Sequence, residues 1–287
     1  MKKTWIVWLL AALLAYGACA CAEGGQVTLL PDQEAAGVFE CTLGDMTLSA
    51  ERNGMTKDQH KWLYLDMSLM NWTVEDKPLA QTVSAVLTWQ GNYKFQAEIV
   101  CDRTVIQPLV SATGKLVFEL PDIVCQADEE TLTLTLTADG QQTVAPFRCP
   151  ADEGSQIVAS GFTYAARHGD AGDVLPLKAV LLENYEGETD EAYRWIEVSF
   201  NVFNWSEKAY APTDIKMVLT YLNRYGFEGT VTYDFETLAP LTCGSGRALY
   251  RVPLAVVNGQ AGSLGLKIGA GEQTWDEAIT LTEDEGV

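Results

Sequence analysis

The chain has 287 residues, of which 39 are Asp or Glu and 19 are Lys or Arg, so its formal net charge is −20. Such an acidic surface disfavours nucleic acid and anionic lipid headgroups as partners, because both are negatively charged. The length alone allows one or two domains.

The first 22 residues have the layout of a secretory signal peptide. Lys2 and Lys3 give a positive start, and an apolar run follows from Trp5 to Ala15. This run is too short to cross a bilayer as a stable helix. We therefore predict that residues 1–22 are a signal peptide and that the mature protein is extracytoplasmic, either secreted or associated with the cell surface.

Two fates are open at the end of this segment. Ala20-Cys21-Ala22 fits a small-x-small cleavage site, which would release a soluble protein starting near Glu23. Alternatively, Cys19 or Cys21 is the acylated first residue of a lipoprotein, although neither has the usual leucine three residues before it. The secreted form is favoured, and the membrane is expected as a partner only through such an anchor.

A strand pattern near the start of the chain returns 133 residues later (195 − 62). Residues 62–73 read WLYLDMSLMNWT, and residues 195–206 read WIEVSFNVFNWS. In both, apolar residues alternate with mostly polar ones. A period of two with one apolar face predicts a half-buried antiparallel strand, with Leu65 and Val198 in equivalent positions.

The match between the two copies continues downstream. The further pairs of segments are 86–89 with 218–221, 92–95 with 224–227, 106–109 with 238–241, 114–121 with 246–253, and 132–136 with 264–268. Each copy therefore has about seven short strands separated by turns, and it lacks a convincing amphipathic helix. This pattern predicts an all-β protein of two tandem β-sandwiches related by internal duplication, joined by a linker at 150–154.

Four of the cysteines fall in the first copy, and the second copy has only Cys243. Export would expose Cys41, Cys101, Cys125 and Cys149 to an oxidising space, so two disulfides are possible. We prefer Cys41–Cys149, whose members bracket the copy, together with Cys101–Cys125, whose members follow two interior strands. The alternative is buried free thiols, because the second copy manages without these four residues.

The sequence contains little that indicates catalysis. His60 and His168 are the only histidines, and neither recurs in the other copy. A Gly-x-Ser-x-Gly motif is absent, and 170–173 lacks the pattern of a calcium loop. We expect no catalytic residue, no metal and no cofactor, and thus no enzyme. A carbohydrate-active enzyme stays as an alternative, because 39 acidic residues always allow some catalytic pair.

Aromatic residues are the best candidates for a binding surface. Trp62 and Trp195 fall on the polar face of their strand, and the second copy holds most of the tyrosines, Tyr210 and Tyr225 among them. Exposed aromatics stack on sugars or anchor protein partners. We predict these four as ligand-stacking residues. The alternative is that they cover the cores or fill the contact between the domains.

Both copies share a series of turn motifs. A strand ends in Asn-aromatic-Ser/Thr, a hairpin follows, and a Pro-Leu step, a Gly-Lys/Arg turn and an apolar strand closing on Pro come after it. These features resemble the telokin-like, immunoglobulin-like domain of unknown function found in Gram-positive bacterial secreted proteins and lipoproteins. Its "Leu-x-Pro-Gly … Gly-x-x-x-Phe-x-Val-Pro" element corresponds to 109–121 and 241–253, with Leu109 and Leu241 in place of the first glycine.

The resemblance implies two tandem immunoglobulin-like β-sandwiches of about seven strands each, at 27–150 and 155–287. It also implies an extracytoplasmic adaptor or binding module, and it brings no catalytic residues. We therefore expect an exported non-catalytic binding or structural module whose partner is an unknown protein or a cell-wall glycan. A lipid-anchored accessory protein of an envelope complex is a further alternative.

Overall fold

The structure is a computed structural model of the chain. It describes residues 37–151, 162, 164, 167–169, 172–189, 191–258 and 263–283. The predicted signal peptide (1–22) and the two candidate acylated cysteines, Cys19 and Cys21, lie outside the described residues.

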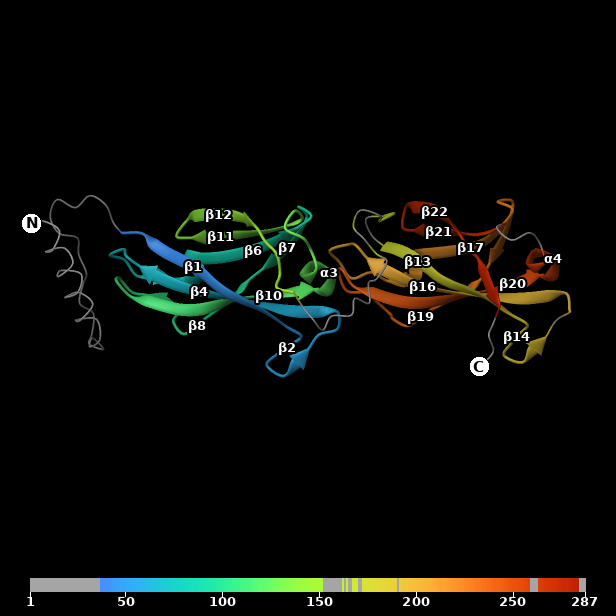
Figure 1. Ribbon diagram of the computed structural model, residues 1–287, viewed down its shortest axis with the longest axis horizontal. Helices are drawn as coiled ribbons and strands as arrows, with labels where there is room; N and C mark the ends of the chain where they lie inside the picture. The colour runs from blue at the N-terminus through green and yellow to red at the C-terminus, as the bar shows by residue number, and fades with distance from the viewer. Residues whose placement is uncertain are drawn as a thin grey trace, which may run out of the picture.

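The first half folds as two four-stranded antiparallel sheets that share one hydrophobic core (Figure 1). One sheet has the order β1-β4-β10-β8, with β1 at Phe39–Ser49, β4 at His60–Asn71, β10 at Ser111–Pro121 and β8 at Glu98–Cys101. The other has the order β12-β11-β6-β7, with β12 at Gln141–Pro146, β11 at Leu132–Ala138, β6 at Val83–Trp89 and β7 at Tyr93–Gln96. The smaller elements are β2 (Glu51–Arg52), β3 (Met55–Thr56), β5 (Lys77–Pro78), β9 (Val105–Ile106), α2 (Leu79–Thr82) and α3 (Asp122–Cys125).

The second half repeats this arrangement. One sheet has the order β19-β20-β16-β13-β23, with β19 at Thr230–Tyr233, β20 at Cys243–Pro253, β16 at Tyr193–Asn204, β13 at Gly172–Leu182 and β23 at Leu281–Glu283. The other has the order β18-β17-β21-β22, with β18 at Tyr225–Glu228, β17 at Ile215–Tyr221, β21 at Leu264–Ala270 and β22 at Gln273–Ala278. The smaller elements are β14 (Asn184–Tyr185), β15 (Glu188–Thr189), η2 (Pro212–Asp214) and α4 (Leu254–Val257).

Register shows that equivalent residues occupy equivalent places. Leu65 pairs with Met46 of β1 and Leu116 of β10, and Val198 pairs with Ala179 of β13 and Ala248 of β20. The strands β1 and β13 even shift register at the same point, between Leu43 and Met46 and between Pro176 and Lys178. The expectation of an all-β chain built from two similar sandwiches is confirmed.

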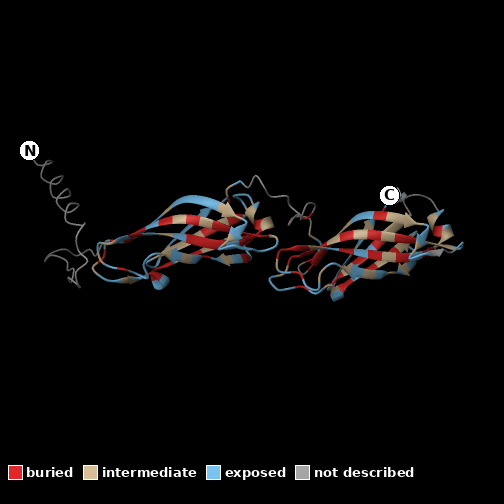
Figure 2. Ribbon diagram, turned by 90° about the horizontal axis from the view of Figure 1, so that it is seen from below, coloured by how far each residue is buried: buried red, intermediate tan, exposed pale blue. Residues whose placement is uncertain are grey.

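Alternation along the central strands builds the cores. The inward residues of β4 and β16 are almost fully buried, while residues between them are more exposed (Figure 2). Burying one such apolar side chain stabilises the fold by about 1.5–3 kcal/mol. The described helices are each a single turn, and none of them has the length and apolar character needed to cross a membrane.

The two halves differ at one sheet edge. In the second half β23 runs parallel to β13 and pairs Leu281 with Ala179. The equivalent segment of the first half is 149–151, by the offset of 132 that relates β12 to β22 (273 − 141). Its middle residue is Pro150, which has no N–H to donate to a ladder, and no strand forms there.

A buried asparagine ends the central strand of each half. The Nδ2 of Asn71 donates to the carbonyls of Ile106 (2.9 Å) and Glu75 (2.8 Å), and its Oδ1 accepts from the N–H of Thr73 (2.9 Å). Asn204 makes the same bonds to Leu238, Lys208 and Ser206. Both Asn-Trp-Thr/Ser sequences are glycosylation sequons, but the asparagines have no exposed surface and act as structural turns.

Replacing this asparagine should destabilise the fold. We expect Asn71→Ala to lower the free energy of unfolding by about 2–4 kcal/mol, because it leaves buried carbonyls without donors. The exposed Asn258, with Asn258→Ala expected to stay within about 0.5 kcal/mol of the parent, is the control. Urea denaturation measures both, and equal losses would contradict the role assigned to Asn71.

Candidate functional site

Three of the four predicted stacking aromatics are buried. Trp62 and Trp195 are each 5% exposed and Tyr210 is 6% exposed, whereas Tyr225 is 52% exposed. The prediction of a ligand-stacking surface is therefore wrong for Trp62, Trp195 and Tyr210, because no ligand can reach their rings.

A hairpin explains the burial of Trp62. Alternation does place Trp62 on the outer face of its sheet, opposite Glu119 of β10. The β2–β3 hairpin, however, reaches across this face, because Arg52 bonds to Glu98 of β8 at 2.7 Å. In the second sandwich the equivalent hairpin, β14–β15, contacts β16, the strand that carries Trp195. Tyr210 instead packs into the core of the second sandwich.

The two sandwiches lie end to end and meet at an aromatic junction (Figure 1). The first sandwich contributes Trp89 and Tyr93, from the turn between β6 and β7. The second contributes Phe203 and Trp205, from the end of β16, with ring centroids 4.3 Å apart. Trp205 stacks on Trp89 at 6.5 Å. These rings are continuous with the core of the first sandwich, so the junction excludes water as a core does.

Residues from the connecting segment complete this junction. The ring of Tyr164 lies edge-on to Trp89 (5.6 Å) and to Trp205 (5.7 Å). Phe162 packs on Phe203 at 5.4 Å, and the guanidinium of Arg167 lies 4.2 Å from the centroid of Tyr164. A cation over an aromatic face adds an electrostatic attraction to the apolar contact.

Three hydrogen bonds fix the relative position of the sandwiches. The Nε2 of Gln59 donates to the carbonyl of Cys243, and its Oε1 accepts from the N–H of the same residue, each at 2.7 Å. The hydroxyl of Tyr93 donates to the carbonyl of Trp205. The Gln59 amide thus pairs with the start of β20 as a neighbouring strand would, which makes the contact directional as well as apolar.

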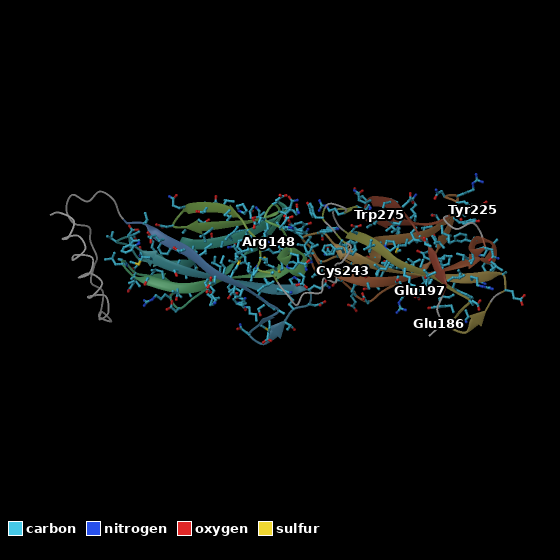
Figure 3. All side chains as sticks on the ribbon, in the orientation of Figure 1. Arg148, Glu186, Glu197, Tyr225, Cys243 and Trp275 are labelled. Carbon is cyan, nitrogen blue, oxygen red and sulfur yellow. The ribbon has the colours of Figure 1, made fainter. Side chains whose placement is uncertain are left out.

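Tyr225 lies at the end of the second sandwich that is far from the junction (Figure 3). It belongs to the β17–β18 turn, where its ring stacks with Tyr221 at 6.3 Å. Leu222 in the same turn is also exposed. This turn thus exposes one aromatic and one apolar side chain, and Tyr225 stays a candidate binding residue.

The cysteines do not follow the preferred pairing. The five cysteines in the described part of the chain carry free thiols. Cys41 lies on β1 and Cys101 on β8, at opposite edges of one sheet. Cys149 instead has Cys125 as its neighbour, and a hydrogen bond joins the two thiols. The preferred pairs Cys41–Cys149 and Cys101–Cys125 are wrong here, because these four thiols are free and Cys149 lies against Cys125 instead.

The Cys125–Cys149 pair titrates unevenly. Its thiol–thiol hydrogen bond, then burial, raises the pKa of Cys125, and the same bond lowers the pKa of Cys149. Burial raises the pKa of the lone Cys41 to about 11. In the second sandwich the equivalent positions hold Val257 and Leu281, so the two thiols also fill an apolar contact.

Among the described residues, the histidines and acidic residues that were candidates for catalysis or metal binding do not form a common site. His60 is buried against the carbonyl of Asp58 (2.8 Å), and His168 bonds to the carboxylate of Asp173 (3.0 Å) while stacking on Trp275. Throughout the described ranges, no three His, Cys, Asp or Glu side chains gather as metal ligands would. A cavity of about 640 Å³ lies beside Cys125 and Cys149, lined also by Lys61 and Arg148.

Sequence reasoning missed the junction residues Gln59, Phe203 and Trp205, although Trp205 belongs to the repeated Asn-Trp-Ser/Thr motif. Trp205 and its counterpart Trp72 stand in the same motif, yet Trp205 is 1% exposed and Trp72 is 46% exposed. The two tryptophans differ only in whether another domain lies over them, and the motif does not carry that information.

These two tryptophans form a matched test of the junction. We expect Trp205→Ala to lower the free energy of unfolding by about 3–5 kcal/mol, because it removes a ring packed on all sides. Trp72→Ala should cost less than about 1 kcal/mol, since that ring is half exposed. Denaturation of the full chain measures both, and similar losses would contradict the junction.

The thiol pair makes a separate prediction. Oxidised glutathione should convert Cys125 and Cys149 to a disulfide, releasing two reduced glutathiones, and the closed loop should add roughly 3 kcal/mol of stability. Peptide mapping identifies the bond, with Cys101→Ser as a control that keeps it. A bond between Cys41 and Cys149 would show that the thiols are arranged otherwise.

Comparison with known proteins adds little to this description. The chain matches no family model and no curated protein. Among solved structures, a similar one is an uncharacterized beta-sandwich protein from Clostridium difficile 630, with 14% identity and a TM-score of 0.32. The similarity covers 38% of this chain and 85% of that one.

Proposed function

We propose that this protein is an exported, non-catalytic binding or structural module that acts at the cell surface or outside the cell. Its two β-sandwiches would be of the telokin-like, immunoglobulin-like kind, and 27–150 and 155–287 would be its domains. The observation that carries the proposal is the junction, where a continuous aromatic core and the Gln59 amide hold the sandwiches end to end.

A fixed junction suits a module that presents two ends at a set separation. Domains joined in one chain usually move relative to each other unless a large apolar interface holds them. Here Trp89, Tyr93, Phe203 and Trp205 form such an interface. Rigid spacing is of use to an adaptor or a scaffold, and it has no role in catalysis by a single site.

The partner would be a protein or a cell-wall glycan. The exposed Tyr225, whose ring stacks on the half-buried Tyr221, offers a stacking surface for either of them. The charge of −20 argues against nucleic acid as a partner. A membrane would be reached only through a lipid on Cys19 or Cys21, and the intact mass of the mature chain distinguishes that form from one starting at Glu23.

Binding to cell walls tests this function. We expect the chain from Glu23 to sediment with isolated Gram-positive walls, and to release no reducing sugar from them. Walls stripped of protein show whether the partner is glycan or protein. Small-angle scattering should give one narrow distance distribution, which the double variant Gln59→Ala/Trp205→Ala broadens because it removes the junction contacts.

Two outcomes would contradict the proposal. Release of sugar would favour the carbohydrate-active enzyme instead. Failure to sediment with either kind of wall would remove the cell-surface role. Val144→Ala, at an exposed apolar residue of β12, serves as the control, since it should leave both scattering and sedimentation unchanged.

A further inference from the structure

The structural repeat gives each junction surface a counterpart at the other end of each sandwich, which no other described residue covers; we call these counterparts free. We call the end of the second sandwich that docks on the first its head face, formed by Phe203, Trp205, Leu241 and Cys243. The surface that receives it is the tail face of the first sandwich, formed by Gln59, Trp89 and Tyr93. The repeat places a second head face at Met70, Trp72, Leu109 and Ser111, and a second tail face at Ala192, Tyr221 and Tyr225.

The two head faces share one backbone. Leu109 and Leu241 both adopt the left-handed conformation, with φ of 59° and 57°. The N–H of Leu109 donates to the carbonyl of Asn71 (2.7 Å), as that of Leu241 does to Asn204 (2.9 Å). The free head face is therefore already shaped like the docked one.

The two tail faces also share one backbone. The turn after Trp89 has Gln90 at φ 52°, and the turn after Tyr221 has Leu222 at the same φ. Tyr225 stands where Tyr93 stands, at the start of the following strand. Tyr225 thus corresponds to the residue whose hydroxyl donates to the carbonyl of Trp205 in the junction.

Burial distinguishes the docked faces from the free ones. On the docked head face Trp205 and Leu241 are 1% and 3% exposed, whereas Trp72 and Leu109 are 46% and 49% exposed. The tail faces differ in the same way, since Tyr93 is buried and Tyr225 is exposed. Large apolar side chains gathered on an exposed end are typical of an interaction surface.

We propose that the free head face of one copy docks on the free tail face of a second copy, so that the junction inside the chain is repeated between chains. The proposal rests on the proposed function and names the chain itself as a partner of that module. The two surfaces differ from each other, so the contact is heterologous and extends into a head-to-tail strand rather than closing as a dimer.

The two free ends carry opposite charges at one pair of equivalent positions. The tail turn carries the exposed Arg224, and the loop beside Trp72 carries the exposed Glu75 and Asp76. In the docked pair of ends the corresponding residues are Asn92 and Lys208 with Ala209, which are not opposite in charge. An added opposite charge pair favours this orientation over others.

Other differences make the contact between chains the weaker one. Ala192 stands in place of Gln59, so the two hydrogen bonds to the backbone of β20 have no counterpart. The junction inside the chain also benefits from a tether, which supplies an effective concentration of about 1 mM. We therefore expect association at a dissociation constant between about 10 μM and 1 mM.

Sedimentation of the chain from Glu23 at rising concentration tests the proposal. Buffer at about 0.15 M salt screens the repulsion between two acidic molecules. We expect the mean mass to rise without levelling at a dimer. Trp72→Ala and Tyr225→Ala should each weaken this association by about tenfold, because each removes the central aromatic of one face.

A mixture of the two variants distinguishes this arrangement from others. The Trp72→Ala chain keeps an intact tail face, and the Tyr225→Ala chain keeps an intact head face. Their equimolar mixture should form heterodimers with near-parental affinity and stop there. Leu222→Glu is a second tail variant, chosen because its side chain is exposed and its fold is easily checked by melting. Val144→Ala should associate as the parent does.

The proposal is overturned if the chain stays monomeric to about 1 mM, if the variants associate like the parent, or if their mixture gains nothing. Each of these results leaves the wall sedimentation and the scattering untouched. A failure of head-to-tail docking is thus distinguishable from a failure of the proposed function.

Discussion

The amide of the asparagine that ends each central strand is the contact on which one end of each sandwich depends. Asn71 and Asn204 are fully buried, and each donates to carbonyls on two different loops. A backbone carbonyl buried without a donor costs about 1–3 kcal/mol. Other conformations of these loops, which would lose the bond to the asparagine, are therefore disfavoured. The end of each sandwich is therefore fixed from within, whether or not a partner covers it.

Period-two patterning predicted the cores well because it is a local property. A strand with one apolar face must bury that face, whichever sheet it joins. This is why Leu65 and Val198 take equivalent places although their side chains differ. The β23 strand was missed for the opposite reason, because this three-residue strand forms only by pairing with the edge of β13. In the first half the equivalent segment contains Pro150, which lacks the N–H that such pairing needs.

The candidate site was harder to predict, because exposure depends on distant parts of the chain. Alternation correctly placed Trp62 on the outer face, but the hairpin that covers it is held by Arg52 and Glu98. The pairing of Cys125 with Cys149 likewise depends on how α3 meets the end of the last strand. Apolar side chains can be read from the sequence, but their exposure to solvent depends on which other parts of the fold cover them.

Charge and shape together determine which surfaces of this molecule can meet. Two copies at −20 repel each other along their sides, and the edge strand β22 adds Asp276 and Glu277 to that repulsion. Its counterpart β12 carries no charge, so lateral pairing there is the main competitor to contact between ends. Such pairing would be symmetric and would close at a dimer, and it would leave Trp72 and Tyr225 exposed. Only contact between ends buries both aromatic faces, and burial of exposed apolar surface is the larger free-energy gain.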